Sequence, residues 1–153
     1  MKLITTDLLA GLAEAAAASP RRRMNHDFHV ASDVVQRMLN ALRDDSYVRP
    51  HRHADPAKTE AFVALVGRIL VLTFDDAGAV QGHAVIEPQG PVRGVDIPPA
   101  TWHALLALDP VAVAFEVIQG PYDPATHKAF APWSPADDAE GLAWIRGLRD
   151  AVL

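Results

Sequence analysis

Apolar positions near the start of the chain repeat at helical spacing. In segment 6–18 one face of a helix carries Leu8, Leu9, Leu12 and Ala16. Thr6 or Asp7 can cap the start of this helix, and Pro20 prevents its continuation. Segment 33–42 is ambiguous, because its apolar residues fit a helical stripe while its short length also suits a strand.

From Tyr47 onward the pattern changes to short runs of β-branched and apolar residues. These runs are Phe62–Val66, Ile69–Phe74, Val80–Ile86, Val92–Ile97, Trp102–Leu108 and Val111–Ile118. Turn-forming residues separate them, for example Asp75-Asp76-Ala77-Gly78 and Pro98-Pro99. Several short strands at close spacing predict an antiparallel sandwich or barrel.

Helical spacing returns at the end of the chain. Ser134 can act as N-cap, Pro135 suits the first helical position, and the following acidic residues Asp137, Asp138 and Glu140 favour the positive end of the helix dipole. One apolar face follows: Leu142, Ile145, Leu148 and Val152. We therefore expect one domain, with a helix and lead-in strand in 1–30, a β core in 31–133 and a helix in 134–153.

Composition narrows the class of protein. The chain has 153 residues, half of them hydrophobic, and a net charge of -5, which argues against nucleic-acid and anionic-membrane partners. Arg21-Arg22-Arg23 is the one basic cluster, and it predicts either a solvated helix exit or an anion contact. Asp7 and Glu14 interrupt the apolar N-terminal run, and no stretch approaches the ~20 apolar residues of a membrane span, so we expect a cytoplasmic protein.

Histidines supply the candidate chemistry. His51 and His53 share one face of a strand with Cα atoms ~6.5 Å apart, which lets both imidazoles reach one ion at ~2.1 Å. Glu60 opens the next apolar run and His103 follows a Pro-Pro turn, while the lack of cysteine excludes thiolate ligands. Three imidazoles and a carboxylate suit Fe, Mn, Ni or Zn and disfavour Ca and Mg.

Two alternatives to this metal site remain. The three histidines can be a core or surface cluster that holds no ion. Glu60 can instead be a carboxylate at a strand edge, paired with Lys58 or Arg68.

The motifs resemble those of a known superfamily. His51-x-His53, Glu60 followed by Gly67, and Pro98-x-Ala100-x2-His103 are similar to the two motifs of the cupins, small β-barrels with a central metal. Four longer sequence segments resemble the WbuC family of cupin-fold metalloproteins more specifically: Val35–Leu42, Ser46–His53, Phe115–Pro124 and Lys128–Trp133. The likeness runs from about Arg23 to Pro135, and members of that family are often associated with bacterial surface-polysaccharide gene clusters.

The resemblance implies a mainly β fold, a cupin-type antiparallel β-barrel (double-stranded β-helix, or jelly roll) with N-terminal and C-terminal helices. It also implies that segment 33–42 is a barrel strand with Gln36 and Arg37 near the mouth or wall. Six residues, 54–59, separate His53 from Glu60, which is a longer spacer than in general cupins. Asp45, Ala100 and Ala107 also depart from the usual motif residues.

Other polar residues are candidates for catalysis or substrate binding. Glu116 lies on an otherwise apolar run, and the alternation of the strand favours an outward position for its side chain. An inward Glu116 would need a partner such as Arg37 or Lys128, and it could accept a proton. His29 is either a pocket residue or a hydrogen-bonded structural one. The candidate substrate contacts are Gln36, Arg37, Lys128 and Tyr122. Tyr122 can also be a packing residue of the core, and the same holds for Trp102. His26, His83 and His127 are expected at the surface.

These features favour a metal-dependent enzyme of the isomerase or epimerase type, acting on a small polar molecule such as a sugar or sugar nucleotide. The association with polysaccharide gene clusters supports the substrate class. The alternatives are an Fe(II)-dependent oxygenase, a non-catalytic metal- or sugar-binding module, and a barrel that the metal only stabilises. A homodimer is expected, since cupin barrels commonly pair, although the last helix can instead cover the barrel.

Overall fold

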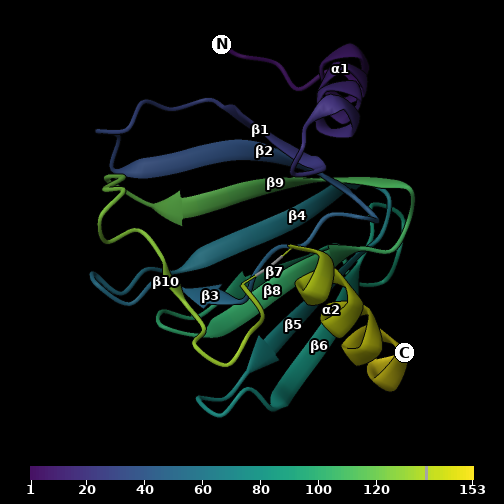
Figure 1. Ribbon diagram of the computed structural model, residues 1–153. Helices are drawn as coiled ribbons and strands as arrows, with labels where there is room; N and C mark the ends of the chain where they lie inside the picture. The colour runs from purple at the N-terminus through teal and green to yellow at the C-terminus, as the bar shows by residue number, and fades with distance from the viewer. Residues whose placement is uncertain (137) are drawn as a thin grey trace.

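The computed structural model describes residues 1–136 and 138–153, and β-strands make up most of it (Figure 1). The elements are α1 (Thr6–Ala18), β1 (Arg23–Asp27), β2 (Val35–Arg43), β3 (His51–Arg52), β4 (Glu60–Val66), β5 (Ile69–Phe74), β6 (Val80–Ile86), β7 (Gly94–Ile97), β8 (Trp102–Ala107), β9 (Val111–Gln119), β10 (Ala129–Phe130) and α2 (Asp138–Val152). Every paired strand is antiparallel. The mainly β prediction is confirmed.

The strands form two five-stranded sheets that pack face to face. One sheet, here sheet A, has the order β1-β2-β9-β4-β7, and sheet B has the order β10-β3-β8-β5-β6. The two are not hydrogen-bonded into a closed barrel. The core between them is apolar and consists of Leu42, Phe62, Ala64, Ile97, Ala112 and Ala114 from sheet A with Ile69, Val71, Ile86, Leu105 and Ala107 from sheet B.

Strand β2 explains the ambiguous pattern of segment 33–42. Its inward residues face the space between the sheets, while its outward residues Leu39 and Ala41 are buried beneath α1. A strand covered on both faces carries apolar residues at consecutive positions, which resembles a helical stripe in the sequence.

The two helices cover the outer faces of the sheets (Figure 1). Helix α1 packs Leu12 and Ala16 against sheet A. Helix α2 lies across sheet B, where Ile145 and its apolar neighbours belong to the same hydrophobic cluster as Phe74 and Trp102. The apolar face of the last helix therefore covers sheet B.

Both helix starts differ from the predicted ones. Thr5, not Thr6 or Asp7, caps α1, because its hydroxyl accepts a hydrogen bond of 3.2 Å from the Leu8 N–H. Ser134 does not cap α2, which begins at Asp138; its hydroxyl donates to the Ala131 carbonyl at 2.8 Å. The predicted role of Asp137 lies outside the described residues. Neither described helix is long and apolar enough to cross a membrane.

Candidate metal centre

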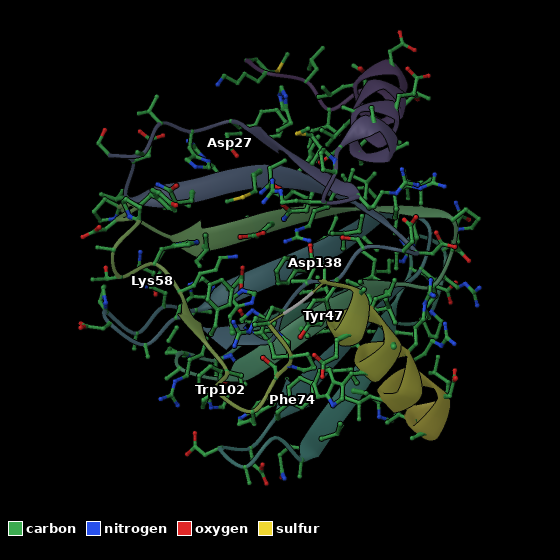
Figure 2. All side chains as sticks on the ribbon, in the orientation of Figure 1. Asp27, Tyr47, Lys58, Phe74, Trp102 and Asp138 are labelled. Carbon is green, nitrogen blue, oxygen red and sulfur yellow. The ribbon has the colours of Figure 1, made fainter. Side chains whose placement is uncertain are left out.

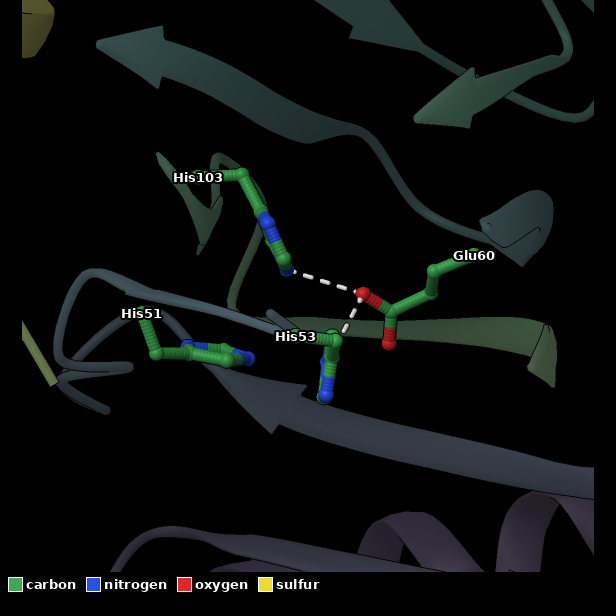
Figure 3. A group of neighbouring side chains, drawn as sticks. All are labelled: His51, His53, Glu60 and His103. Carbon is green, nitrogen blue, oxygen red and sulfur yellow. Dashed lines mark ion pairs between the residues drawn. The ribbon is translucent and has the colours of Figure 1, made fainter. Parts of the chain in front are cut away.

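Three histidines and one glutamate meet between the two sheets. His51 belongs to β3, His53 follows it, Glu60 is the first residue of β4 and His103 lies on β8. All four are at most 4% exposed. Their potential ligand atoms lie within 4.8 Å of one another, and Figure 3 shows the four side chains converging.

Backbone carbonyls set the orientation of all three imidazoles. The Nδ1 atoms of His51 and His103 lie 2.9 Å from the carbonyl oxygens of Arg49 and Thr101. His53 Nδ1 makes the same type of contact with the His127 carbonyl. Because a carbonyl only accepts hydrogen bonds, each Nδ1 carries a proton, which leaves Nε2 as the ring nitrogen that faces the centre of the cluster. This is the usual arrangement behind histidine ligands of metals.

The charge states of the cluster fit a cation. Burial lowers the pKa of His51 well below its ordinary value, so this ring is neutral. Burial alone would raise the pKa of Glu60, but the adjacent His103 and His53 hold it well below the usual glutamate range, so this carboxyl is anionic. The cluster thus joins the anionic carboxylate of Glu60 to the neutral ring of His51.

The atoms that face one another lack protein partners. Glu60 Oε2 lies 2.8 Å from His103 Nε2 and 3.4 Å from His53 Nε2 (Figure 3). Among the described residues none of these three buried atoms has a hydrogen-bond partner in suitable geometry. A cation between the carboxylate and the imidazoles would give these buried atoms a partner. Ligand atoms on opposite sides of an ion, each ~2.1 Å from it, are ~4.2 Å apart. The ligand atoms of this cluster lie within 4.8 Å of one another, so only a small contraction is needed for them to bind an ion.

The long spacer between His53 and Glu60 folds into a loop that leaves Glu60 facing the histidines. The Lys58 backbone N–H donates to the His53 carbonyl at 3.3 Å, which closes the loop. The Lys58 side chain donates to the Pro121 carbonyl, and Arg68 pairs with Asp109. The alternative pairing of Glu60 with Lys58 or Arg68 is therefore wrong.

A cavity of about 620 Å³ opens beside the cluster and is lined by His51 and Glu60, among others. Glu116 also lines it, so this side chain points inward and not outward as the alternation favours. The Asn40 amide donates a hydrogen bond to the Glu116 carboxyl, whose pKa is raised well above the ordinary value by burial and then by the Glu60 charge. The partner of Glu116 is thus Asn40, not Arg37.

The structure brings most, but not all, of the other candidates to this cavity. Gln36, His29, Tyr122 and Lys128 line it. Gln36 also anchors the chain before β2, since its amide donates to the Ala31 and Asp33 carbonyls. Arg37 lies on the opposite face of β2 and pairs with Asp33 at 2.7 Å, so the structure does not place it at the cavity.

Sequence reasoning missed His127 and Asn40. His127, expected at the surface, is half-buried, and its ring lies 4.7 Å from that of His53 and 4.6 Å from that of Tyr122. Burial, with a contribution from Lys128, lowers the pKa of His127 to about 4. The inward direction of Asn40 could be predicted only after segment 35–43 was known to be a strand, β2.

Comparisons by sequence assign a family but no activity. A family model described as "Domain of unknown function (DUF6016)" matches residues 4–86. No protein with a curated description matches the chain in sequence.

Solved structures show the fold. The capsular polysaccharide assembling protein CapF from Staphylococcus aureus is similar with a TM-score of 0.60 and 20% identity, over 73% of this chain and 32% of CapF. An oxalate oxidase in complex with the substrate analogue glycolate is similar with a TM-score of 0.60 and 16% identity, over 87% of this chain and 68% of the oxidase. The chain thus spans about a third of CapF. Both neighbours are cupin-fold proteins, and the fold of this chain is of the cupin type.

Proposed function

The chain belongs to the family described as domain of unknown function DUF6016, and we propose that it is a metal-dependent enzyme of the isomerase or epimerase type. Its substrate would be a sugar or sugar nucleotide. His51, His53, Glu60 and His103 would hold a divalent transition metal, Fe, Mn, Ni or Zn. Once bound, the ion would supply Lewis acidity that polarises a carbonyl or hydroxyl oxygen of the substrate.

The observation that carries this proposal is the placement of Glu116. Its carboxyl lines the same cavity as Glu60 and His51, so a substrate next to the ligand set also meets Glu116. The Asn40 amide fixes this carboxyl in one orientation. A buried acid in a fixed position can take a proton from a substrate carbon or hydroxyl and return it, which is the step that isomerases and epimerases share. Glu116 is thus the proposed catalytic residue.

Tyr122, Lys128 and Gln36 would contact the substrate from the cavity wall, together with His29. A volume of about 620 Å³ accommodates a ligand of the size of a sugar or a sugar nucleotide. Two likenesses support a sugar-related substrate. The CapF neighbour is named for capsular polysaccharide assembly, and four sequence segments of this chain resemble the WbuC family. We also propose a cytoplasmic homodimer, for which half-exposed Val63 on the outer face of sheet A is a candidate contact.

The metal is tested first. Protein purified without a metal-affinity column should carry about one transition-metal ion per chain by elemental analysis. His51→Ala should lose the ion, whereas the control His83→Ala, which changes an exposed histidine, should keep it. Metal-free wild-type protein would overturn the proposal.

Proton transfer is tested separately by solvent exchange. Metal-loaded protein is incubated in D2O with ketose phosphates and with nucleotide-linked sugars, and carbon-bound deuterium is measured by mass spectrometry. Wild-type protein should incorporate deuterium, and a chelator should abolish the exchange. Glu116→Gln should lose exchange while it keeps the metal. Bound metal without exchange or product from any of these compounds would favour a binding module.

A further inference from the structure

Cationic side chains line the part of the cavity that the proposed chemistry does not use. Arg23 of β1 and Arg49, just before β3, both lie in its wall, as does Arg21. Arg23 is half-buried, and burial followed by repulsion from Arg21 lowers its pKa. Two guanidinium groups in one wall need a counter-charge or a ligand that supplies one.

Neutral acceptors hold these two arginines in place. Arg23 Nη1 donates to the Tyr47 carbonyl at 2.7 Å. Arg49 Nε donates to the Ser134 hydroxyl at 3.0 Å, and its Nη2 donates to the Ala131 carbonyl at 3.1 Å. Within the described part of the chain no carboxylate forms an ion pair with either guanidinium. Among the described residues, neutral acceptors therefore orient both groups, and the Asp138 charge acts on Arg23 without an ion pair.

The turn before β1 divides the basic cluster of the sequence into two directions. Arg21 and Arg23 line the cavity, whereas Arg22 does not. Arg22 instead forms an ion pair of 2.9 Å with Asp45, from a backbone with φ of 57°. The cluster is thus not a uniformly solvated segment, because two of its three charges face the cavity and the third is paired outside it.

Arg23 lies far from Glu60 along the cavity, whereas Arg49 lies nearer the metal ligands. Gln36, Met38, Asn40 and Leu42 of β2 all line the cavity. Glu60 is in register with Ile118 and so with Gln36, while Arg23 is in register with Leu42. Six residues of strand correspond to about 20 Å. Arg49 is two residues from His51, whose Nδ1 lies 2.9 Å from the Arg49 carbonyl oxygen, and its guanidinium carbon lies 5.2 Å from the ring centroid of Phe130, the register partner of His51.

We infer that the cavity binds an elongated ligand with an oxyanion, a phosphate or a carboxylate, at Arg23 and with its polar, uncharged end at the metal ligands. This inference rests on the proposed function only for the metal-bound end. Guanidinium groups match oxyanions because they donate two parallel hydrogen bonds from a fixed plane. The anion site itself needs no metal.

The test measures binding by calorimetry with three probes of similar size: glucose 6-phosphate, glucuronate and glucose. At least one charged probe should bind about tenfold or more tightly than glucose, and its affinity should fall with added salt. Tighter binding of glucose 6-phosphate assigns the site to phosphate, and tighter binding of glucuronate assigns it to carboxylate. Equal affinities for all three probes would overturn the inference.

Variants locate the site. Arg23→Gln should weaken the charged probe about tenfold or more and leave the affinity for glucose unchanged. Arg22→Gln removes the same charge one residue away, outside the cavity, and should leave both affinities unchanged. If Arg23→Gln does not fold, as judged by circular dichroism, Arg21→Gln at an exposed position takes its place. Unchanged affinity in the folded variant used would contradict the inference.

The same titrations in the His51→Ala background separate the two proposals. A protein without metal that still binds the charged probe through Arg23 would support the anion site even if the metal proposal fails. A metal-loaded protein whose affinity for the charged probe does not depend on Arg23 would overturn the anion site and leave the metal proposal intact.

Discussion

His51 and His103 are direct partners in the register of β3 and β8, and their ring centroids lie 4.5 Å apart. Side chains opposite each other in an antiparallel pair point to the same face, so strand pairing alone brings these two imidazoles together. Glu60 comes from the other sheet, across the interior. The cluster therefore joins sheets A and B, and its energetics depend on how they pack.

Glu60→Gln should lower both metal affinity and metal-free stability. The substitution removes an anionic ligand, so metal affinity should fall by at least tenfold. It also removes a carboxylate whose pKa His103 and His53 hold below the usual glutamate range, so its anionic form stabilises the folded protein at neutral pH. The metal-free variant should therefore lose about 1–3 kcal/mol of unfolding free energy. Metal titration and urea denaturation of the metal-free protein measure the two effects.

The control for this prediction is Glu14→Gln, which changes an exposed glutamate of α1. It should alter neither metal affinity nor stability by more than about 0.5 kcal/mol. If metal-free Glu60→Gln were as stable as the wild-type protein or more stable, His103 and His53 would not stabilise the Glu60 carboxylate.

Two glycines of α2 should respond to alanine in opposite directions. A Cβ atom at Gly147 would meet nothing within 4 Å, so Gly147→Ala should stabilise the protein by about 0.5–1 kcal/mol through helix propensity. A Cβ atom at Gly141 would lie 2.0 Å from the Tyr47 ring, which is held by a hydrogen bond to the Pro135 carbonyl. Gly141→Ala should destabilise the protein by about 1–3 kcal/mol.

Thermal or urea unfolding compares the two glycine variants directly, each acting as the control for the other. Figure 2 shows Tyr47 beside the start of α2, where the clash would separate the helix from sheet B. Equal stabilisation in both variants would mean that α2 does not pack against Tyr47 as described.

Lys58 should hold the segment that carries His127 and Lys128 in place. Its side chain is 5% exposed and donates to the Pro121 carbonyl at 2.8 Å. Lys58→Met keeps the apolar stem and removes the donor, so amide hydrogen exchange in residues 120–128 should accelerate while metal content stays the same. Lys2→Met is the control, because Lys2 makes a similar bond to the Phe28 carbonyl at the surface. If amide hydrogen exchange in residues 120–128 is unchanged in Lys58→Met, Lys58 does not hold this segment in place.

The Arg68–Asp109 pair should make the free energy of unfolding depend on pH. Hydrogen bonds from Arg68 lower the pKa of Asp109 below its ordinary value of 3.8. A lowered carboxyl pKa in the folded state stabilises the protein above 3.8, and this contribution is lost as the pH falls through the folded-state pKa. The stability difference between wild-type protein and Asp109→Asn should therefore shrink on acidification below that value.

Urea denaturation at several pH values checks this, together with an NMR titration of the Asp109 carboxyl. In Arg68→Gln its pKa should return toward the ordinary value. Because the pair is exposed, the contribution should be small. A constant difference down to low pH would mean that the charge of Asp109 does not contribute to stability.

The sequence alone determined the local features of this protein. The period of apolar residues predicts α1 and the strands from Glu60 onward, because a half-buried element shows its geometry in its own spacing. His51 and His53 are also readable as one face, since two residues of one strand need no tertiary information.

Only the tertiary structure decided which distant residues meet. The inward direction of Glu116, its Asn40 partner, the position of His127 against His53 and the separation of Arg22 from Arg23 all depend on contacts between elements. Even β2 was ambiguous, because α1 buries its second face and hides the alternation of a strand. The spacing of residues along a chain encodes the direction of side chains within one element, whereas the approach of two elements is set by the packing of the whole core.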